Sequence, residues 1–200
     1  MKWEKRVFDL ICSILGLIML TPFLLVIAVL IKLGDGGPVF FYQERVGCRG
    51  RLFRICKFRT MIPSVGQAGG QLTVGNDSRV TRIGYLLRKT KLDELPQLIN
   101  VLVGEMSLVG PRPEVPRYVA FYNQEQREVL NLMPGITDLA SIKYRDESSL
   151  LAQSADPEKT YIQEIMPRKI QINLAYARDA NLLNDIGVII STFAAILKIH

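Results

Sequence analysis

The stretch Lys91-Leu92-Asp93-Glu94-Leu95-Pro96-Gln97 sets two adjacent carboxylates at the start of an amphipathic pattern. The apolar residues of this pattern recur at helical spacing, at Leu95, Leu98, Ile99 and Leu102. Gly104 then ends the run, as glycine commonly does after the last turn of a helix. The pattern predicts a helix with Asp93 near its N-cap and Glu94 in its first turn.

Two interpretations of this carboxylate pair stay open on the pattern alone. Asp is a preferred N-cap residue and Glu an ordinary first-turn residue, so both could simply stabilise the helix. The N-terminus of a helix also carries unpaired N–H groups and a partial positive charge, which favour an ionised carboxylate and attract phosphate. In that setting Asp93 could act as a nucleophile, and Glu94 could hold a hard cation.

The composition of the 200-residue chain indicates one compact domain with an appendage. The chain is 48% hydrophobic with a net charge of +6, which favours a membrane surface or a phosphate-rich ligand. Nucleic acid is the rival partner for a basic protein, but no zinc pattern, recognition-helix signature or aromatic platform supports it. Cys12, Cys48 and Cys56 form no C-x-x-C pattern, so we expect reduced thiols facing the cytosol. A lone histidine, His200, argues against a His-based triad or a zinc site.

An almost wholly apolar segment over residues 10–31 is long enough to cross a bilayer. Thr21 and Pro22 lie in its middle, where the proline removes a backbone hydrogen bond and bends a helix. Basic residues flank the segment on both sides, at Lys2, Lys5, Arg6 and Lys32, so the positive-inside bias has no clear direction. From these features alone, a spanning helix and a re-entrant helix-break-helix are both open.

The remaining chain alternates turns with short strand and helix patterns. Strand formers over 39–42 and an alternating pattern over 52–58 predict a β-hairpin. Residues 63–77 are glycine-rich and predict a loop over a site. Helical patterns cover 83–89, 116–132, 157–180 with an interruption near Pro167, and 186–197, which either packs on the core or lies in the membrane interface. The predicted fold class is α/β, mainly helical with a short β-hairpin.

Arg112 stands between Pro111 and Pro113, which make its backbone extended and stiff. A guanidinium held in this way is suited to bidentate contact with phosphate. Taken alone, the tripeptide could equally be a rigid loop with a solvated arginine.

Five motifs follow one another along the chain: Gly37-Pro38-Val39-Phe40-Phe41, Gln43-Glu44-Arg45-Val46-Gly47, Lys57-Phe58-Arg59-Thr60-Met61, Asp93-Glu94-Leu95-Pro96-Gln97-Leu98-Ile99-Asn100-Val101, and Gly104-Glu105-Met106-Ser107-Leu108-Val109-Gly110-Pro111-Arg112-Pro113. In this order they resemble the bacterial sugar transferases known as monotopic phosphoglycosyl transferases. The similarity extends from Lys5 to about Thr192, and the length is that of the minimal catalytic form.

The resemblance implies an enzyme that moves a sugar-1-phosphate from a UDP-sugar to a polyprenol phosphate, such as undecaprenyl phosphate, and releases UMP. It implies a ping-pong mechanism with Mg²⁺, in which Asp93 is the nucleophile and Glu94 the metal ligand. Arg112 matches a phosphate-binding position, and the basic residues Lys57, Arg59 and Arg88 match positions that line the site.

The resemblance also implies a location and an organisation. Residues 1–35 would form a re-entrant membrane helix broken at Thr21-Pro22, and residues 36–200 a cytosolic catalytic domain with interfacial amphipathic helices. The protein would lie at the cytoplasmic face of the bacterial inner membrane, among its lipids, with no nucleic acid and with a homodimer left open. A non-catalytic membrane scaffold of a glycan-assembly complex is the alternative, against which the intact Asp93, Glu94 and Arg112 argue.

The chain departs from the family pattern in two places. Asp138-Leu139-Ala140-Ser141-Ile142 replaces a commoner Gly-hydrophobic-Ala-Gln-Val, and Asn173 stands where an Asp is more usual. Neither departure touches the carboxylate pair. The first lies in a region that shapes sugar or nucleotide recognition, so the sequence leaves the sugar unassigned.

Overall fold

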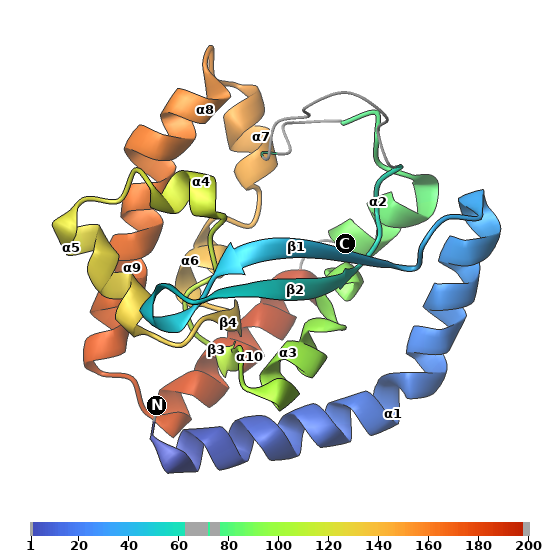
Figure 1. Cartoon of the computed structure of the whole chain (residues 1–200), viewed down its shortest axis with the longest axis horizontal. Coiled ribbons are helices and arrows are strands. Elements are labelled where there is room, and N and C mark those ends of the chain that lie inside the picture. Colours follow the sequence, from blue (N-terminus) through green and yellow to red (C-terminus); the bar gives the residue numbers. More distant parts are fainter. Residues whose placement is uncertain (1, 63–71, 73–76, 198–200) are drawn as a thin grey trace.

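The computed structural model describes residues 2–62, 72 and 77–197, so the predicted loop over 63–77 lies outside the described residues apart from Leu72 and Asp77. Helices predominate around a small β-hairpin, and a long N-terminal helix runs along the outside of the fold (Figure 1). The predicted class, mainly helical with a short hairpin, is confirmed.

The first element is α1 (Trp3–Asp35), a continuous helix of 33 residues that bends along its length (Figure 1). The expected break therefore takes the form of a bend. Pro22 lies inside the helix and has no N–H to bond the carbonyl four residues earlier. The Thr21 hydroxyl donates to the Leu17 carbonyl at 2.6 Å, which adds a bond beside the proline.

The predicted hairpin is confirmed as β1 (Phe40–Val46) and β2 (Leu52–Phe58), which pair antiparallel. Phe40 lies opposite Phe58 and their rings stack, with centroids 5.5 Å apart. Other described elements are α2 (Arg82–Lys89), η2 (Leu92–Glu94), α3 (Gln97–Val103), β3 (Ser107–Val109), α4 (Pro116–Val119), α5 (Gln124–Arg127), η3 (Glu128–Asn131), β4 (Gly135–Thr137), α6 (Leu139–Lys143), α7 (Glu147–Ala152), α8 (Pro157–Thr160), the π-helical turn η4 (Tyr161–Ile165), α9 (Met166–Arg178) and α10 (Leu182–Leu197).

One prediction about these elements is wrong in detail, and one pair of strands was not predicted. The helix expected over 116–132 is split into α4, α5 and η3, because Asn123 and Gln126 form a reciprocal capping box that starts a new helix. The sequence pattern also missed β3 and β4, which pair in parallel. Strands of three residues are too short to show an alternating pattern.

Both halves of α1 are attached to the same globular body. In the N-terminal half, Arg6 donates to the carbonyls of Val101 and Leu102 at 2.6 and 3.0 Å, and so satisfies the end of α3. Lys5 pairs with the buried Asp185 of α10 at 2.5 Å. The C-terminal half buries Ile27 and Ile31 in a cluster with β2 and α2.

The opposite face of α1 is exposed and apolar. The exposed side chains include Val7, Ile11, Leu15, Met19, Leu25, Val29 and Leu33. This helix is long and apolar enough to cross a membrane. The C-terminal α10 has two faces, because Val188 is buried against the core whereas Ile190 and Phe193 are exposed. Exposed apolar surface of this extent is typical of a membrane or protein interface.

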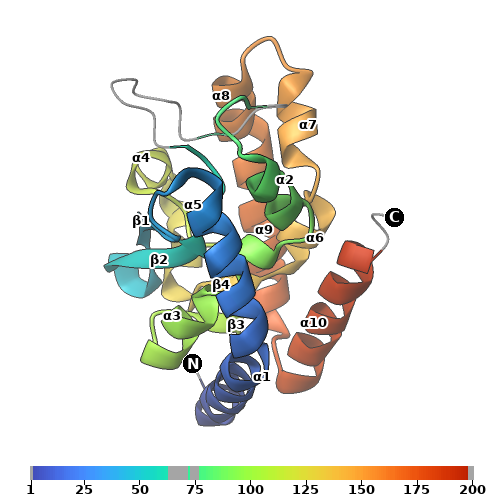
Figure 2. The same cartoon turned by 90° about the vertical axis from the view of Figure 1, so that its right-hand side faces the viewer.

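Helix α2 is fixed between α1 and β2. Leu87 is buried with Ile31 and Phe58, and Ile83 packs against the same cluster. Gly84 faces the backbone of Thr60, where an added Cβ would lie 2.1 Å from the Thr60 carbonyl oxygen. The two views of Figures 1 and 2 both show α2 beside the C-terminal part of α1. A glycine at position 84 is therefore needed for α2 to lie so close to the Thr60 backbone.

We predict that Gly84→Ala lowers the free energy of unfolding by about 1–3 kcal/mol, the usual cost of overpacking, because backbone atoms cannot move aside. The matched control is Gly187→Ala in α10, where an added Cβ meets nothing within 4 Å. There the better helix propensity of alanine should leave stability unchanged or raise it by up to about 1 kcal/mol. Thermal unfolding in detergent measures both, and equal melting temperatures for the two variants would contradict the packing of α2.

Candidate active site

The carboxylate pair lies in a short 3₁₀ turn that precedes α3. The pattern placed Asp93 near the N-cap of the following helix, and this placement is wrong: Pro96 holds the N-cap position of α3 and no side chain caps it, so the capping interpretation does not hold. Pro96 favours a new helix start, which leaves η2 as a separate turn. Lys91 enters that turn in the left-handed region, at φ 58°, a conformation that is strained for lysine. Gly104 ends α3 in the left-handed region as predicted, at φ 91°.

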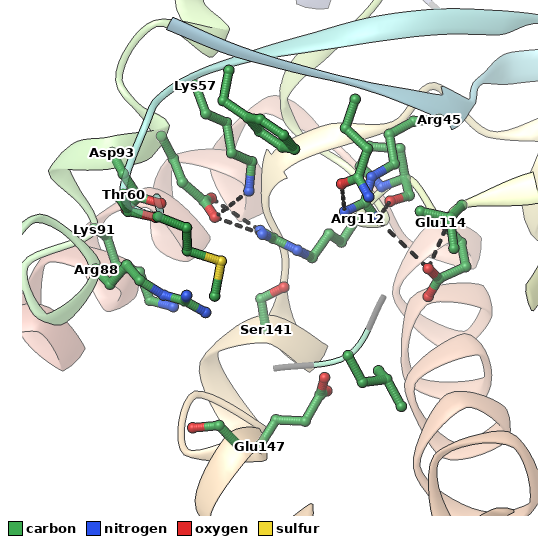
Figure 3. Close-up of a pocket in the computed structure, with 18 of the residues that line it drawn as sticks. Arg45, Lys57, Thr60, Arg88, Lys91, Asp93, Arg112, Glu114, Ser141 and Glu147 are labelled. Carbon is green, nitrogen blue, oxygen red and sulfur yellow. Dashed lines mark hydrogen bonds and ion pairs between the residues drawn. The ribbon is translucent and has the colours of Figure 1, made fainter. Parts of the chain in front are cut away.

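Glu94 is held by two basic side chains from distant parts of the chain, Lys57 and Arg112, which are labelled in Figure 3. Arg112 donates in a bidentate manner, with Nη1 to Oε2 at 2.9 Å and Nη2 to Oε1 at 2.5 Å. Lys57 of β2 donates from Nζ to Oε1 at 2.9 Å. The Glu94 side chain is 11% exposed, so this ion triad is largely shielded from water. Removing one partner from a buried triad leaves an uncompensated charge, which is strongly unfavourable.

Asp93 has a different environment from its neighbour. It is 8% exposed, and its Oδ1 has no hydrogen-bond partner among the described residues. Burial raises the pKa of Asp93 to about 6, and the adjacent Glu94 adds to the shift. A buried acceptor without a partner is uncommon and calls for a ligand or a chemical role. Asp93 is therefore the carboxylate of the pair with an oxygen that lacks a partner in the described chain, whereas Glu94 is bound by two cations.

The charges of the triad keep Glu94 ionised. Burial opposes its ionisation, but Arg112 and Lys57 outweigh burial and hold the pKa of Glu94 well below its usual range. Glu94 in turn raises the pKa of Arg112 above its usual value. Burial lowers the pKa of the Lys57 ammonium to about 8, with Glu94 opposing the shift. The two adjacent carboxylates therefore differ in their pKa values: that of Glu94 is lowered, so it stays ionised, and that of Asp93 is raised.

The carboxylate pair opens into a cavity of about 1820 Å³. Its walls come from β1, β2, α2, α7, α9 and the segment that follows Gly110. At the end opposite Asp93, Glu114 accepts a hydrogen bond from the Tyr161 hydroxyl and lies 3.5 Å from Arg45 (Figure 3). Sequence reasoning missed this second polar cluster. Two features of the sequence could have pointed to this cluster: the motif that contains Arg45, and Glu114 directly after the Pro111-Arg112-Pro113 tripeptide.

Arg59 and Arg88, the other two basic residues predicted to line the site, lie in different surroundings. Arg59 is 6% exposed and forms a bidentate ion pair with Asp35 at the end of α1, while its Nε donates to the Pro38 carbonyl at 2.5 Å. This contact fastens α1 to the hairpin and occupies the guanidinium. Arg88 lines the cavity beside Lys91 and Asp93 (Figure 3). Phosphate binding by Arg59 and Arg88 stays a prediction.

Both departures from the family pattern lie at this cavity. Asp138 caps α6, where its carboxylate accepts from the Ser141 N–H at 2.9 Å and the Ser141 hydroxyl at 2.5 Å. Ser141 faces the cavity near Arg112 (Figure 3). Asn173 of α9 is buried and lines the same cavity. Ser141 and Asn173 are therefore placed where they can contact a ligand in the cavity, whereas Asp138 positions Ser141.

The residues present fit a magnesium ion that is shared with a phosphate ligand. Among the described residues, no group of three or more His, Cys, Asp or Glu side chains could form a complete metal site. However, Glu94 Oε2 accepts a single hydrogen bond, from Arg112, and Asp93 Oδ1 has no partner within the described part of the chain. Mg²⁺ is commonly held by one or two carboxylates together with substrate phosphates, so this oxygen pair suits it.

Comparisons with known proteins place the chain among sugar transferases. It matches the family model described as bacterial sugar transferase over residues 1–199. It is 37% identical over 198 residues to the UDP-N-acetylgalactosamine-undecaprenyl-phosphate N-acetylgalactosaminephosphotransferase of Aeromonas hydrophila, covering 96% of the chain and 43% of that protein. It is 38% identical over 196 residues to the UDP-glucose:undecaprenyl-phosphate glucose-1-phosphate transferase of Klebsiella pneumoniae, covering 94% of the chain and 39% of that protein.

A shorter relative matches along nearly its whole length. The exopolysaccharide production protein PSS of Rhizobium leguminosarum bv. phaseoli is 37% identical over 203 residues, covering 94% of the chain and 92% of that protein. The chain thus spans less than half of the two longer relatives and most of this one. The predicted resemblance is confirmed: the chain belongs to the bacterial sugar transferase family.

Proposed function

We propose that this chain transfers a sugar-1-phosphate from a UDP-sugar to a polyprenyl phosphate through a covalent intermediate on Asp93. The observation that carries the proposal is the contrast within the carboxylate pair. Glu94 is bound by Arg112 and Lys57, whereas the buried Asp93 Oδ1 has no partner in the described chain. The names of the relatives supply the donor and acceptor classes, UDP-sugars and undecaprenyl phosphate.

In the first step, an Asp93 oxygen attacks the phosphorus that bears the sugar. A new P–O bond to Asp93 forms, the bond to the bridging oxygen breaks, and UMP leaves with that electron pair. In the second step, a phosphate oxygen of the polyprenyl phosphate attacks the same phosphorus, and Asp93 is released as a carboxylate. Each attack brings two anions together, so the surrounding cations are needed to offset the repulsion.

Arg112 and Lys57 hold Glu94 in place and bring positive charge to the cavity. Glu94 and Asp93 would hold Mg²⁺ together with the phosphates of the donor. When bound, the cation offsets negative charge on the diphosphate as it passes to the leaving UMP. A scaffold without catalysis is the alternative, but it gives no reason for a buried carboxylate that lacks a partner.

We also propose that α1 enters the membrane and returns on the cytoplasmic side. Support comes from its two attachments: Arg6 contacts the end of α3, and Ile31 packs with α2 on the same globular body. A helix that crossed the bilayer would put its two ends on opposite faces of a hydrocarbon core about 30 Å thick, so the globular body that contacts both ends would itself have to lie within the membrane. The bend around Pro22 and the exposed apolar face fit a helix that dips into one leaflet.

The activity is tested by UMP release from UDP-glucose and UDP-N-acetylgalactosamine in detergent, with undecaprenyl phosphate as acceptor. We predict release with at least one donor, a loss of about 100-fold or more in EDTA, and recovery with Mg²⁺ because the cation offsets the diphosphate charge. Zinc should not substitute, since the oxygen ligands are those of a hard cation. Full activity in EDTA would remove the metal from the mechanism, and no release from any UDP-sugar would contradict the proposed reaction.

The topology is tested with single cysteines in a background that lacks Cys12, Cys48 and Cys56. Trp3→Cys reports on the start of α1 and Arg51→Cys on the exposed hairpin turn. We predict that a membrane-impermeant maleimide labels neither position in intact cells and both after permeabilisation. Labelling of one position alone in intact cells would mean that α1 spans the membrane. Labelling of both would place the catalytic body on the outer face.

A further inference from the structure

The cations of the cavity fall into two groups. Those near its centre are already neutralised, since Lys57 and Arg112 pair with Glu94 and Arg45 lies 3.5 Å from Glu114. Four further cations line the cavity on the side of α2, and they form no ion pair with the described residues: Arg82, Arg88, Lys89 and Lys91. Cationic side chains that line a cavity without ion-pair partners in the described chain are suited to binding an anionic ligand.

The spacing of these side chains gives α2 two distinct faces. Gly84 and Leu87 are buried on the face toward α1 and β2. Arg82, Tyr85 and Lys89 recur at helical spacing on the other face, are exposed, and line the cavity. Tyr85 is 63% exposed. Basic residues with an exposed aromatic ring on a short amphipathic helix are typical of a surface at the level of lipid headgroups.

The place of α2 connects the membrane helix to the carboxylate pair. On one side Ile83 and Leu87 pack with Ile27 and Ile31 of α1. On the other side the chain runs from Lys89 through Lys91 directly into the turn that carries Asp93. An anion that moves along α2 from the membrane therefore stays beside positively charged side chains until it reaches Asp93, whose Oδ1 has no partner among the described residues.

We propose that the exposed face of α2, with Arg82, Tyr85 and Lys89, binds the phosphate of the lipid acceptor and leads it to Asp93. This inference rests on the proposed function, which requires two phosphate substrates to reach one aspartate in turn. The soluble donor can enter the cavity from the cytosol. The acceptor is held by its hydrocarbon chain in the membrane, so its phosphate must approach along an element that adjoins α1, and α2 is such an element.

In the second step of the proposed reaction, the attack by the acceptor phosphate, cations are needed to hold an anionic nucleophile near an anionic centre. The acceptor phosphate carries up to two negative charges and attacks a phosphorus that is itself bonded to anionic oxygens. Arg82 and Lys89 can hold the phosphate by charge-assisted hydrogen bonds. Tyr85 can contact the first, apolar part of the prenyl chain through its ring. Donor cleavage makes no such demand on α2, because the donor has no lipid chain.

The test separates the two half-reactions in the full-length protein reconstituted in lipid nanodiscs. UMP release with UDP-sugar and no acceptor measures the first, and transfer of the loaded phospho-sugar to added undecaprenyl phosphate measures the second. We expect Arg82→Gln with Lys89→Gln to leave the first rate within about twofold. The second rate should fall by about tenfold or more at limiting acceptor, since a charged hydrogen bond commonly changes affinity by that factor.

The matched control is Lys159→Gln with Arg168→Gln. It removes the same two charges from exposed positions on α8 and α9 that do not line the cavity. The control should leave both rates unchanged. Tyr85→Ala should act like the α2 double variant, and Tyr85→Phe should keep the activity because the ring remains.

The outcomes separate the inference from the proposed function. Equal loss in both half-reactions, or loss in the first alone, would show that α2 serves the donor and would overturn the inference. Unchanged rates in the α2 variants would overturn it as well. A wild-type protein that releases no UMP from any UDP-sugar would overturn the proposed function together with the inference. The unchanged first half-reaction also shows that the variants are folded.

Discussion

The rest of the site depends on the ion triad of Glu94, Arg112 and Lys57. The triad joins three segments that are far apart in the sequence: the turn before α3, the proline-flanked loop after β3, and the second strand of the hairpin. Arg112 and Lys57 both pair with Glu94, and the Oδ1 atom of the adjacent, buried Asp93 has no partner in the described chain. The two neighbouring carboxylates therefore differ: Glu94 is an anion held by two cations, whereas Asp93 has a raised pKa and an Oδ1 atom without a partner in the described chain.

Helix α1 and the candidate site are packed together into one unit. The end of α1 is fastened to the hairpin by the Asp35–Arg59 ion pair, and its inner face is buried against α2. The hairpin carries Lys57 into the triad, and α2 leads into the turn of Asp93. These contacts fix the position of the Asp93–Glu94 pair relative to α1. In the proposed reaction, in which a soluble donor and a membrane-bound acceptor both reach Asp93, they would hold the carboxylate at a constant distance from the bilayer.

Much of this arrangement could be predicted from the sequence, and the failures have physical causes. The hairpin, α2 and the end of α3 at Gly104 follow from local patterns, and the linked motifs predicted the family. The residues Asp93, Glu94, Lys57 and Arg112 were named, but only the folded chain shows that two cations converge on Glu94. Arg59 was grouped with Lys57 because both match basic positions of the family motif Lys57-Phe58-Arg59. Strand β2 ends at Phe58, however, so Arg59 turns to Asp35. The Glu114–Tyr161 contact joins residues 47 positions apart, which no local pattern can reveal.

The central claim is that Asp93 becomes covalently attached to the phospho-sugar. The most direct measurement is intact-protein mass spectrometry after incubation with a UDP-sugar and Mg²⁺ but no acceptor, followed by peptide mapping. We expect one phospho-sugar adduct, located on Asp93, that disappears when undecaprenyl phosphate is added. Asp93→Asn should form no adduct while unfolding near the wild-type temperature, because the amide has nearly the same shape and is a poor nucleophile. An adduct on another residue, or an active Asp93→Asn protein, would contradict the account.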